Sequence, residues 1–149
     1  MALSTTNPLI SQGTLNRLFG SFQVVSFPAL NVTPSYLGKE GIGLRFESPV
    51  TDYIETLTGG VTSPAPYQKV EVTLHLLRTQ QLGIFYEQQK QVSSLLGNTV
   101  LYIDSTVWPA WTFTNCAIMN TDPMRIDGTD PSYVVLINGF YNTNAALWS

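Results

Sequence analysis

The sequence predicts a mainly β protein, a barrel-like or sandwich-like subunit that carries one α-helix at about residues 80–96. Segments in which apolar and polar residues alternate recur along the chain, and turn-forming Gly and Pro clusters separate them. One stretch alone repeats apolar residues at helical spacing. We expect the 149 residues to form a single domain (1–149) with an N-terminal arm over residues 1–20 and a C-terminal tail over residues 142–149.

The first half of the chain is predicted to be β structure that proline interrupts. Residues 21–32 are rich in β-branched and aromatic side chains. Pro28 limits a strand there to the edge of a sheet, because proline has no N–H group to donate. Residues 41–58 predict one or two further strands. Their first part has a period of two, set by Ile42, Leu44 and Phe46.

A long loop or hairpin excursion is predicted over residues 48–66. Its last part, residues 59–66, is dense in Gly and Pro and carries no charge. This composition is typical of a loop, and we expect it at the tip of the excursion.

Residues 67–77 give the clearest strand pattern. One face is apolar and consists of Val70, Val72, Leu74 and Leu76. The other face is polar and consists of Lys69, Glu71, Thr73 and His75. This alternation predicts one buried face and one face that meets water or a lumen.

The helical pattern runs through residues 79–96. The residues expected on its inner side are Leu82, Phe85, Tyr86, Val92 and Leu96. Thr79 is the expected N-cap, and Gly97 with Asn98 is the expected stop.

The second half of the chain returns to β structure. Residues 99–106 predict a strand, and residues 107–119 predict a strand with a bend at Pro109. Residues 120–131 form an acidic loop. Residues 132–141 are almost continuously apolar, which predicts a strand buried on both faces.

Charge and composition exclude several classes of protein. Charged residues make up 11% of the chain and the net charge is −3, which argues against a basic nucleic-acid-binding or membrane-binding surface. A single cysteine, Cys116, excludes an internal disulfide framework, and a single histidine, His75, excludes His–His metal motifs. With no secretory signal and no apolar span in the sequence, we expect a soluble protein of a reducing compartment, with no cofactor or metal.

Catalytic patterns are also weak, and we expect a protein that is not an enzyme. His75 is the only histidine that can act as a base, and it lies within a strand. Cys116 is expected in the core, and the acidic residues of loop 120–131 are expected to form turns. The least favoured alternative is a hydrolase that depends on one of three carboxylates, Asp104, Asp122 or Asp127.

The order of elements from Tyr67 to Ile118 resembles the tail tube protein family of contractile-tailed bacteriophages, whose architecture the type VI secretion tube protein shares. The strand YQKVEVTLHLLRTQ, the helix LGIFYEQQKQVSSLLG and the strand NTVLYIDSTVWPAWTFTNCAI carry the resemblance. The segment SPVTDYIETLTGGVTSPAPY looks like the long hairpin of such proteins. The resemblance extends over about residues 21–141.

This resemblance implies a structural virion protein. Hexameric rings of it would stack into the hollow tail tube through which phage DNA is ejected into the host, and assembly would take place in the host cytoplasm. The implied partners are further copies of the chain and the tail sheath, baseplate and tail terminator proteins. DNA would pass without specific binding, since a negative chain repels phosphate, and this chain would not insert into a membrane.

Two alternatives to the repeating tube subunit stay open. One is another tail ring of related fold, namely a tube initiator, a terminator or a baseplate component. The other is a β-sandwich module that binds carbohydrate or decorates a capsid, for which Trp108 and Trp111 are the expected contact surface.

For the tube subunit, candidate functional residues follow from these expectations. The candidate lumen-facing residues are Lys69, Glu71, Thr73 and His75. The candidate subunit contacts lie in the arm, the excursion and the tail, and they are Leu9, Ile10, Leu15, Tyr53, Ile54, Leu57, Gly59, Gly60, Tyr141, Leu147 and Trp148.

Overall fold

A computed structural model describes residues 10–149 of the chain. Leu9, one of the predicted contact residues, lies outside the described residues. The elements occur in the order β1 (Ser21–Val24), η2 (Pro28–Leu30), η3 (Pro34–Tyr36), β2 (Leu37–Phe46), β3 (Thr51–Glu55), β4 (Gly60–Pro64), β5 (Tyr67–Leu77), α1 (Leu82–Val92), β6 (Leu95–Tyr102), β7 (Trp111–Thr121), β8 (Ser132–Asn142) and η4 (Ala145–Trp148).

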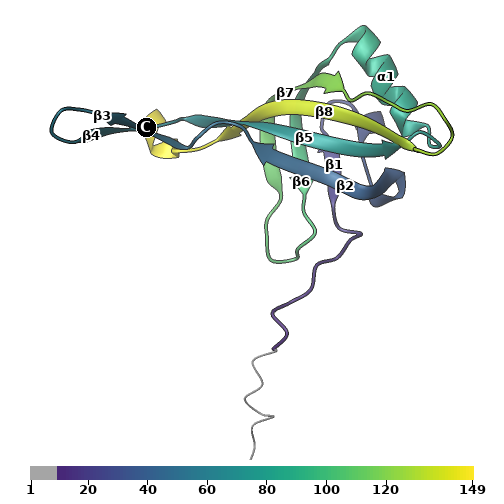
Figure 1. Ribbon diagram of the computed structural model, residues 1–149, viewed down its shortest axis with the longest axis horizontal. Coiled ribbons are helices and arrows are strands. Elements are labelled where there is room, and N and C mark those ends of the chain that lie inside the picture. The colour runs from purple at the N-terminus through teal and green to yellow at the C-terminus, as the bar shows by residue number, and fades with distance from the viewer. Residues whose placement is uncertain (1–9) are drawn as a thin grey trace, which may run out of the picture.

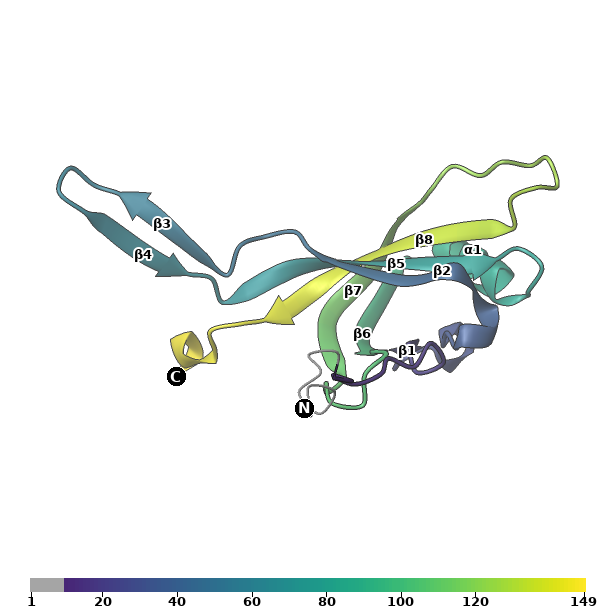
Figure 2. The ribbon, with the colours of Figure 1, turned by 60° about the horizontal axis from the view of Figure 1, so that its bottom comes forward.

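Six of the strands form one antiparallel sheet in the order β1-β6-β7-β8-β5-β2. The sheet curls into a half-barrel, with α1 packed at one end of the strands (Figure 1). Strands β3 and β4 form a separate two-stranded sheet that projects away from the half-barrel (Figure 2). The predicted class, mainly β with one α-helix, is confirmed for residues 10–149.

The centre of the sheet is the long pairing of β5 with β8. It runs over 11 residues of each strand, from Tyr67 opposite Asn142 to Leu77 opposite Ser132. The predicted apolar face of β5 is completely buried, and its polar face is half-buried. The strand at residues 67–77 is therefore confirmed in both its bounds and its buried face.

The curl of the sheet brings distant strands together over the core. Phe46 on β2 and Trp111 on β7 have ring centroids 5.1 Å apart, although β5 and β8 lie between their strands. In a flat sheet these two strands would be about 14 Å apart. Tyr141 of β8 stacks on Trp111 at 5.5 Å, so aromatic rings close this end of the half-barrel.

Helix α1 is shorter than predicted, and it begins and ends at other residues. The expected helix over residues 80–96 ends at Val92, because the backbone is extended at Ser93 and Leu95 already belongs to β6. The expected stop at Gly97 and Asn98 is wrong, since both residues lie within β6, where the register shifts. The expected cap at Thr79 is also wrong, because the N-cap is Gln81, without a side-chain hydrogen bond.

The inner side of the helix is only partly as predicted. Leu82 and Tyr86 are buried, but Phe85 is 41% exposed and Val92 is 85% exposed. The hydroxyl group of Tyr86 donates a hydrogen bond of 2.6 Å to the carbonyl oxygen of Leu30 in η2. The helix thus packs against η2 through a narrow face, and the rest of its apolar surface stays outside.

Four predicted segments after the first strands need correction. Residues 59–66 are not a loop, because Gly60–Pro64 is strand β4 and the turn lies just before it. Residues 132–141 are not buried on both faces, because burial alternates along β8. The strands expected at 99–106 and 107–119 run instead from Leu95 to Tyr102 and from Trp111 to Thr121, so that Pro109 lies in the connection between them. For β4, β6 and β7 the partner strand, rather than the local sequence, decides the bounds.

Gly139 tests how tightly β7 packs against β8. An added Cβ atom there would lie 2.5 Å from Sγ of the buried Cys116. We expect Gly139→Ala to lower the free energy of unfolding by about 1–3 kcal/mol, as overpacking of a core does. Chemical denaturation measures this loss, and the second substitution Cys116→Ala should recover much of it.

Gly43→Ala is the matched control for Gly139→Ala. Gly43 also lies within a strand, but the nearest atom to its added Cβ would be Cβ of Thr73 at 3.6 Å, an ordinary contact. This variant should be close to wild type in stability. A Gly139→Ala protein that is as stable as Gly43→Ala would show that the contact between the strands is looser than described.

Candidate assembly surfaces

The β3–β4 hairpin is the most exposed part of the regular structure. Its strands pair from Thr51 opposite Pro64 to Glu55 opposite Gly60, and Thr56 N–H donates to the carbonyl oxygen of Gly59 at 2.8 Å across the turn. Every residue of both strands except Thr51 is exposed. A two-stranded hairpin that stands alone is only marginally stable in water, and both strands of this one lie outside the core.

Apolar side chains lie on both faces of this hairpin. Directly paired residues of an antiparallel ladder share a face. Ile54 and Val61 therefore form one exposed apolar pair, while Tyr53 lies on the opposite face. Leu57 is completely exposed at the turn. The predicted contact residues of the excursion, including Gly59 and Gly60 at the turn and at the start of β4, are thus all accessible in a single chain.

The C-terminal tail is held at the base of the hairpin. Ala65 N–H donates to the carbonyl oxygen of Val50 at 2.7 Å and closes the base. The side chains of Thr143 and Asn144 each donate to the carbonyl oxygen of Ala65 at 2.7 Å. Asn144 adopts a left-handed backbone conformation with φ of 48°, which directs η4 out of the line of β8.

The predicted contact residues of the tail differ in exposure. Leu147 and Trp148 in η4 are exposed, so they form an apolar surface next to the hairpin base. Tyr141 is half-buried in the aromatic cluster with Trp111. In the arm, Ile10 and Leu15 are exposed. Their contacts with other subunits stay predictions.

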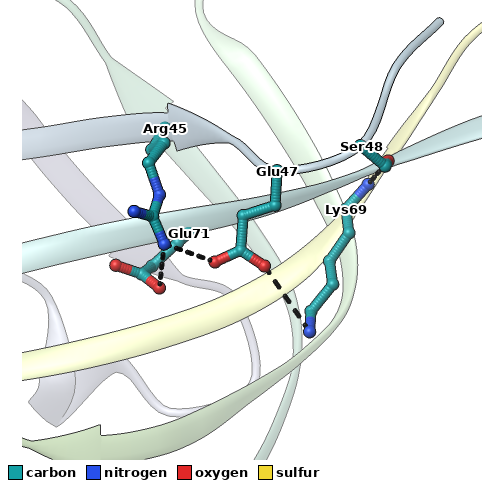
Figure 3. Close-up of polar contacts among 5 residues, drawn as sticks. All are labelled: Arg45, Glu47, Ser48, Lys69 and Glu71. Carbon is teal, nitrogen blue, oxygen red and sulfur yellow. Dashed lines mark hydrogen bonds and ion pairs between the residues drawn. The ribbon is translucent and has the colours of Figure 1, made fainter.

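A network of charged groups lies where the chain leaves β2 for the hairpin (Figure 3). Nη2 of Arg45 lies 3.1 Å from Oε1 of Glu47 and 3.3 Å from Oε2 of Glu71. Nζ of Lys69 lies 3.5 Å from Oε2 of Glu47. Lys69 N–H donates to Oγ of Ser48 at 2.9 Å, so the same residues also fix the backbone at this point.

The two carboxyl groups of this network have opposite pKa shifts. The pKa of Glu47 is lowered by its hydrogen bonds with Glu71 and Arg45 and by the charge of Lys69. The pKa of Glu71 is raised by its hydrogen bond with Glu47 and by burial, which outweigh the attraction of Arg45. The pair therefore prefers to ionise at Glu47 and to keep the proton at Glu71.

The predicted lumen-facing residues share the face of β5 that is opposite the core. Lys69 and Glu71 belong to the charged network, and Nδ1 of His75 lies 3.0 Å from the carbonyl oxygen of Gly41 on β2. Sequence reasoning missed the neighbours that β8 adds to this face, Leu136 opposite Thr73 and Asn138 opposite Glu71. The sequence carries no signal for them, because residues 132–141 are apolar at both alternating sets of positions and the neighbours depend on which strand pairs with β5. That this face lines a lumen stays a prediction.

A groove follows the open side of the half-barrel, between β2 and the end of β6. Its volume is about 860 Å³. The outer edge of β2 pairs with no other strand in residues 10–149, whereas Val32 forms a bridge with Phe22 on the outer side of β1. The charged residues around the groove are Arg17, Lys39, Glu40 and Asp104. No local pattern in the sequence indicates this groove, because it forms between segments that are far apart in the chain.

The two tryptophans expected as a contact surface are packed against each other. The ring centroids of Trp108 and Trp111 are 6.0 Å apart with 31° between the planes. Trp111 also packs on Phe46 and Tyr141, so it belongs to the aromatic closure of the half-barrel. Only Trp108, which is 59% exposed, offers a large free ring surface. This arrangement is not a flat platform of two rings.

In residues 10–149 no group of three or more His, Cys, Asp and Glu side chains is placed to hold a metal ion. No helix in the same range is long and apolar enough to cross a membrane.

Comparison with known proteins gives similarity to solved structures alone. No family model matches the chain, and no curated protein matches it. Among solved structures, the chain is similar to the anti-feeding prophage cap, described as the AFP tube terminating cap, with a TM-score of 0.47 and 12% sequence identity. The similarity covers 95% of this chain and 95% of that chain. A similarity at this level carries no functional conclusion, so function has to be argued from this chain's own surfaces.

The charged network predicts opposite effects for its two carboxyl groups. Because the pKa of Glu47 is lowered in the folded protein, ionised Glu47 stabilises the fold at any pH above 4.5, the ordinary pKa of a glutamate. This stabilisation is lost as the pH falls through the lowered pKa. We expect Glu47→Gln to lower the free energy of unfolding by about 0.5 kcal/mol at pH 7. The difference should vanish in acid, as measured by denaturation over a pH series.

Glu71→Gln is the control for Glu47→Gln. Because the pKa of Glu71 is raised in the folded protein, protonated Glu71 stabilises the fold at low pH. This stabilisation is lost as the pH rises from 4.5, the ordinary pKa of a glutamate, through the raised pKa. Removing this carboxyl group should therefore leave stability at pH 7 unchanged or higher. Equal losses in the two variants at pH 7 would contradict the assigned order of ionisation.

Proposed function

We propose that this chain is a structural, non-enzymatic subunit of a phage-type tail. Copies of it assemble into hexameric rings, and the rings stack into the hollow tube through which DNA is ejected. The chain is then located in the tail of the virion, after assembly in the host cytoplasm. The observation that carries this proposal is the projecting β3–β4 hairpin, with exposed Tyr53, Ile54, Leu57 and Val61 and no core of its own.

The hairpin supports assembly because its apolar side chains are exposed to water, and burying them lowers the free energy. A soluble monomer gains nothing from apolar residues on both faces of an isolated hairpin, and such surface favours aggregation. Permanent interfaces between subunits are apolar and poor in charge. A hairpin that is covered on both faces by neighbouring copies would bury these residues and become stable.

The free edge of β2 supports lateral contact between copies. An unpaired edge can accept a strand from another chain. Lys39 and Glu40 and the irregular register before Ile42 protect the first part of this edge. The regular part from Ile42 to Phe46 stays available. Lateral pairing of sheets around a ring would remove this edge and give each subunit two neighbours.

The proposal also fits the charge of the chain. With a net charge of −3, a tube of many copies is negative, and its wall repels DNA phosphates rather than holding them. We propose the face of β5 with Lys69, Glu71, Thr73 and His75 as the lumen surface. Sheath, baseplate and terminator proteins are the proposed further partners.

Excision of the hairpin tests this function. The base is closed by the hydrogen bond between Val50 and Ala65, so residues 51–64 can be replaced by a two-residue Gly-Gly turn that suits an antiparallel pair. We expect this variant to keep its fold, shown by a circular dichroism spectrum and a Tm close to those of wild type. It should form no rings or tubes under negative-stain electron microscopy.

Wild-type protein at the same concentration is the reference for the excision variant. Stacked rings in the wild type and monomers in the variant support the tube subunit. Wild-type protein that stops at a single ring would indicate a terminator, initiator or baseplate ring instead. A variant that still forms tubes would contradict the assigned role of the hairpin, and a wild type that stays monomeric at high concentration would contradict assembly by this chain alone.

A further inference from the structure

Helix α1 and η2 form a second apolar groove, which no role described above uses. It lies between the C-terminal half of α1 and the segment before β2, and its volume is about 370 Å³. Its apolar lining includes Phe27, Pro28, Ala29, Phe85 and Val92, and its polar lining includes Gln88. All the residues that line it are uncharged.

The residues of this groove explain the mistaken prediction for the helix. Their helical spacing places Phe85 and Val92 on an inner side, yet both are exposed, at 41% and 85%. Leu95 at the start of β6 and Val25 directly after β1 are also exposed, at 67% and 53%. Exposed apolar patches of this kind mark sites of contact with another molecule. We infer that the core-like spacing of Phe85 and Val92 serves a contact with a second chain, which would bury these side chains.

We propose that this groove binds the tip of the β3–β4 hairpin, with Leu57 as its anchor, from a second copy of the chain. This inference rests on the proposed self-assembly and names the surface that receives the hairpin. The hairpin lies at one end of the long axis of the molecule, and α1 lies towards the other end (Figure 1). A hairpin thus cannot reach the groove of its own chain.

The chemistry of the two surfaces is matched. The tip, from Thr56 to Gly59, carries no charge and presents one completely exposed leucine. In the groove between α1 and η2 this leucine meets an uncharged, mainly apolar wall. The larger groove beside β2 is rimmed by Arg17, Lys39, Glu40 and Asp104. Covering these charged groups with an uncharged tip would remove their hydration without supplying a partner.

The geometry of this contact also gives stacking a direction. A contact between two different surfaces is heterologous, and it propagates from copy to copy instead of closing as a dimer. Each contact is small, but a ring presents several hairpins to the next ring at once, and linked contacts reinforce one another. The tip and groove therefore provide the axial contact, whereas the edge of β2 provides the lateral one.

Cysteine pairing between two chains tests the proposed contact. Leu57→Cys and Val92→Cys are purified separately, mixed and oxidised under mild conditions. We expect a disulfide-linked dimer in this mixture at more than ten times the yield found when Leu57→Cys is mixed with Ile126→Cys. Ile126 is 87% exposed and does not line the groove, so it is the matched control. The native Cys116 is buried and does not compete.

A charge placed in the groove gives a second, independent measurement. Phe85→Asp should raise the concentration needed for tube formation at least tenfold, because it puts a carboxylate where Leu57 binds. Ile84→Asp is the neighbouring control, since Ile84 is 54% exposed and lies outside the groove. Thermal unfolding of both variants verifies that each is folded.

The possible results separate this inference from the proposed function. Assembly by wild type, a Leu57–Val92 crosslink and failure of Phe85→Asp alone support the contact. Tubes that form without the crosslink, or Phe85→Asp tubes at the wild-type concentration, overturn the contact and leave the proposed function standing. Wild-type protein that does not assemble, together with cysteine variants that do not crosslink, overturns both.

Discussion

A sheet that curls only halfway around its core keeps a free edge, and this constraint shapes the rest of the molecule. The ladder of β5 with β8 holds the centre of the sheet, and aromatic rings meet across its buried face at one end. The curl brings β2 and β1 towards each other without pairing them. An open groove and the unpaired edge of β2 remain between them, and hydrogen bonds for that edge have to come from outside the chain.

The low charge of the chain agrees with this half-closed sheet and its free edge. Only 11% of the residues are charged, and many apolar residues stay outside the core. Some of them lie on the hairpin, on the tail beside it and in the groove between α1 and η2, and others lie elsewhere on the surface, among them Leu18, Trp108 and Ile126. Surface of this kind is stable when other copies cover it, so composition, fold and the proposed assembly agree.

Short-range polar contacts fix the direction in which the hairpin leaves the body. Arg45, Glu47, Lys69 and Glu71 form a charged network on one side of its root, and Asn144 binds the base on the other. Contacts of this kind contribute little to stability individually. They restrict the angle of a long projection, and a small change of angle at the root becomes a large displacement at Leu57. The network thus positions the hairpin more than it stabilises the fold.

The sequence alone determined the class of fold, the strand at residues 67–77 with its two faces, and the excursion at 48–66, because these features depend on local periodicity and turn composition. Tertiary structure decided the rest. Leu95 and Leu96 continue the helical period but become a strand, because β7 pairs with them. Phe85 and Val92 have core spacing but stay outside, because η2 covers only the face with Tyr86. The grooves and the charged network join residues distant in the chain, and local patterns carry no information about which strands become neighbours.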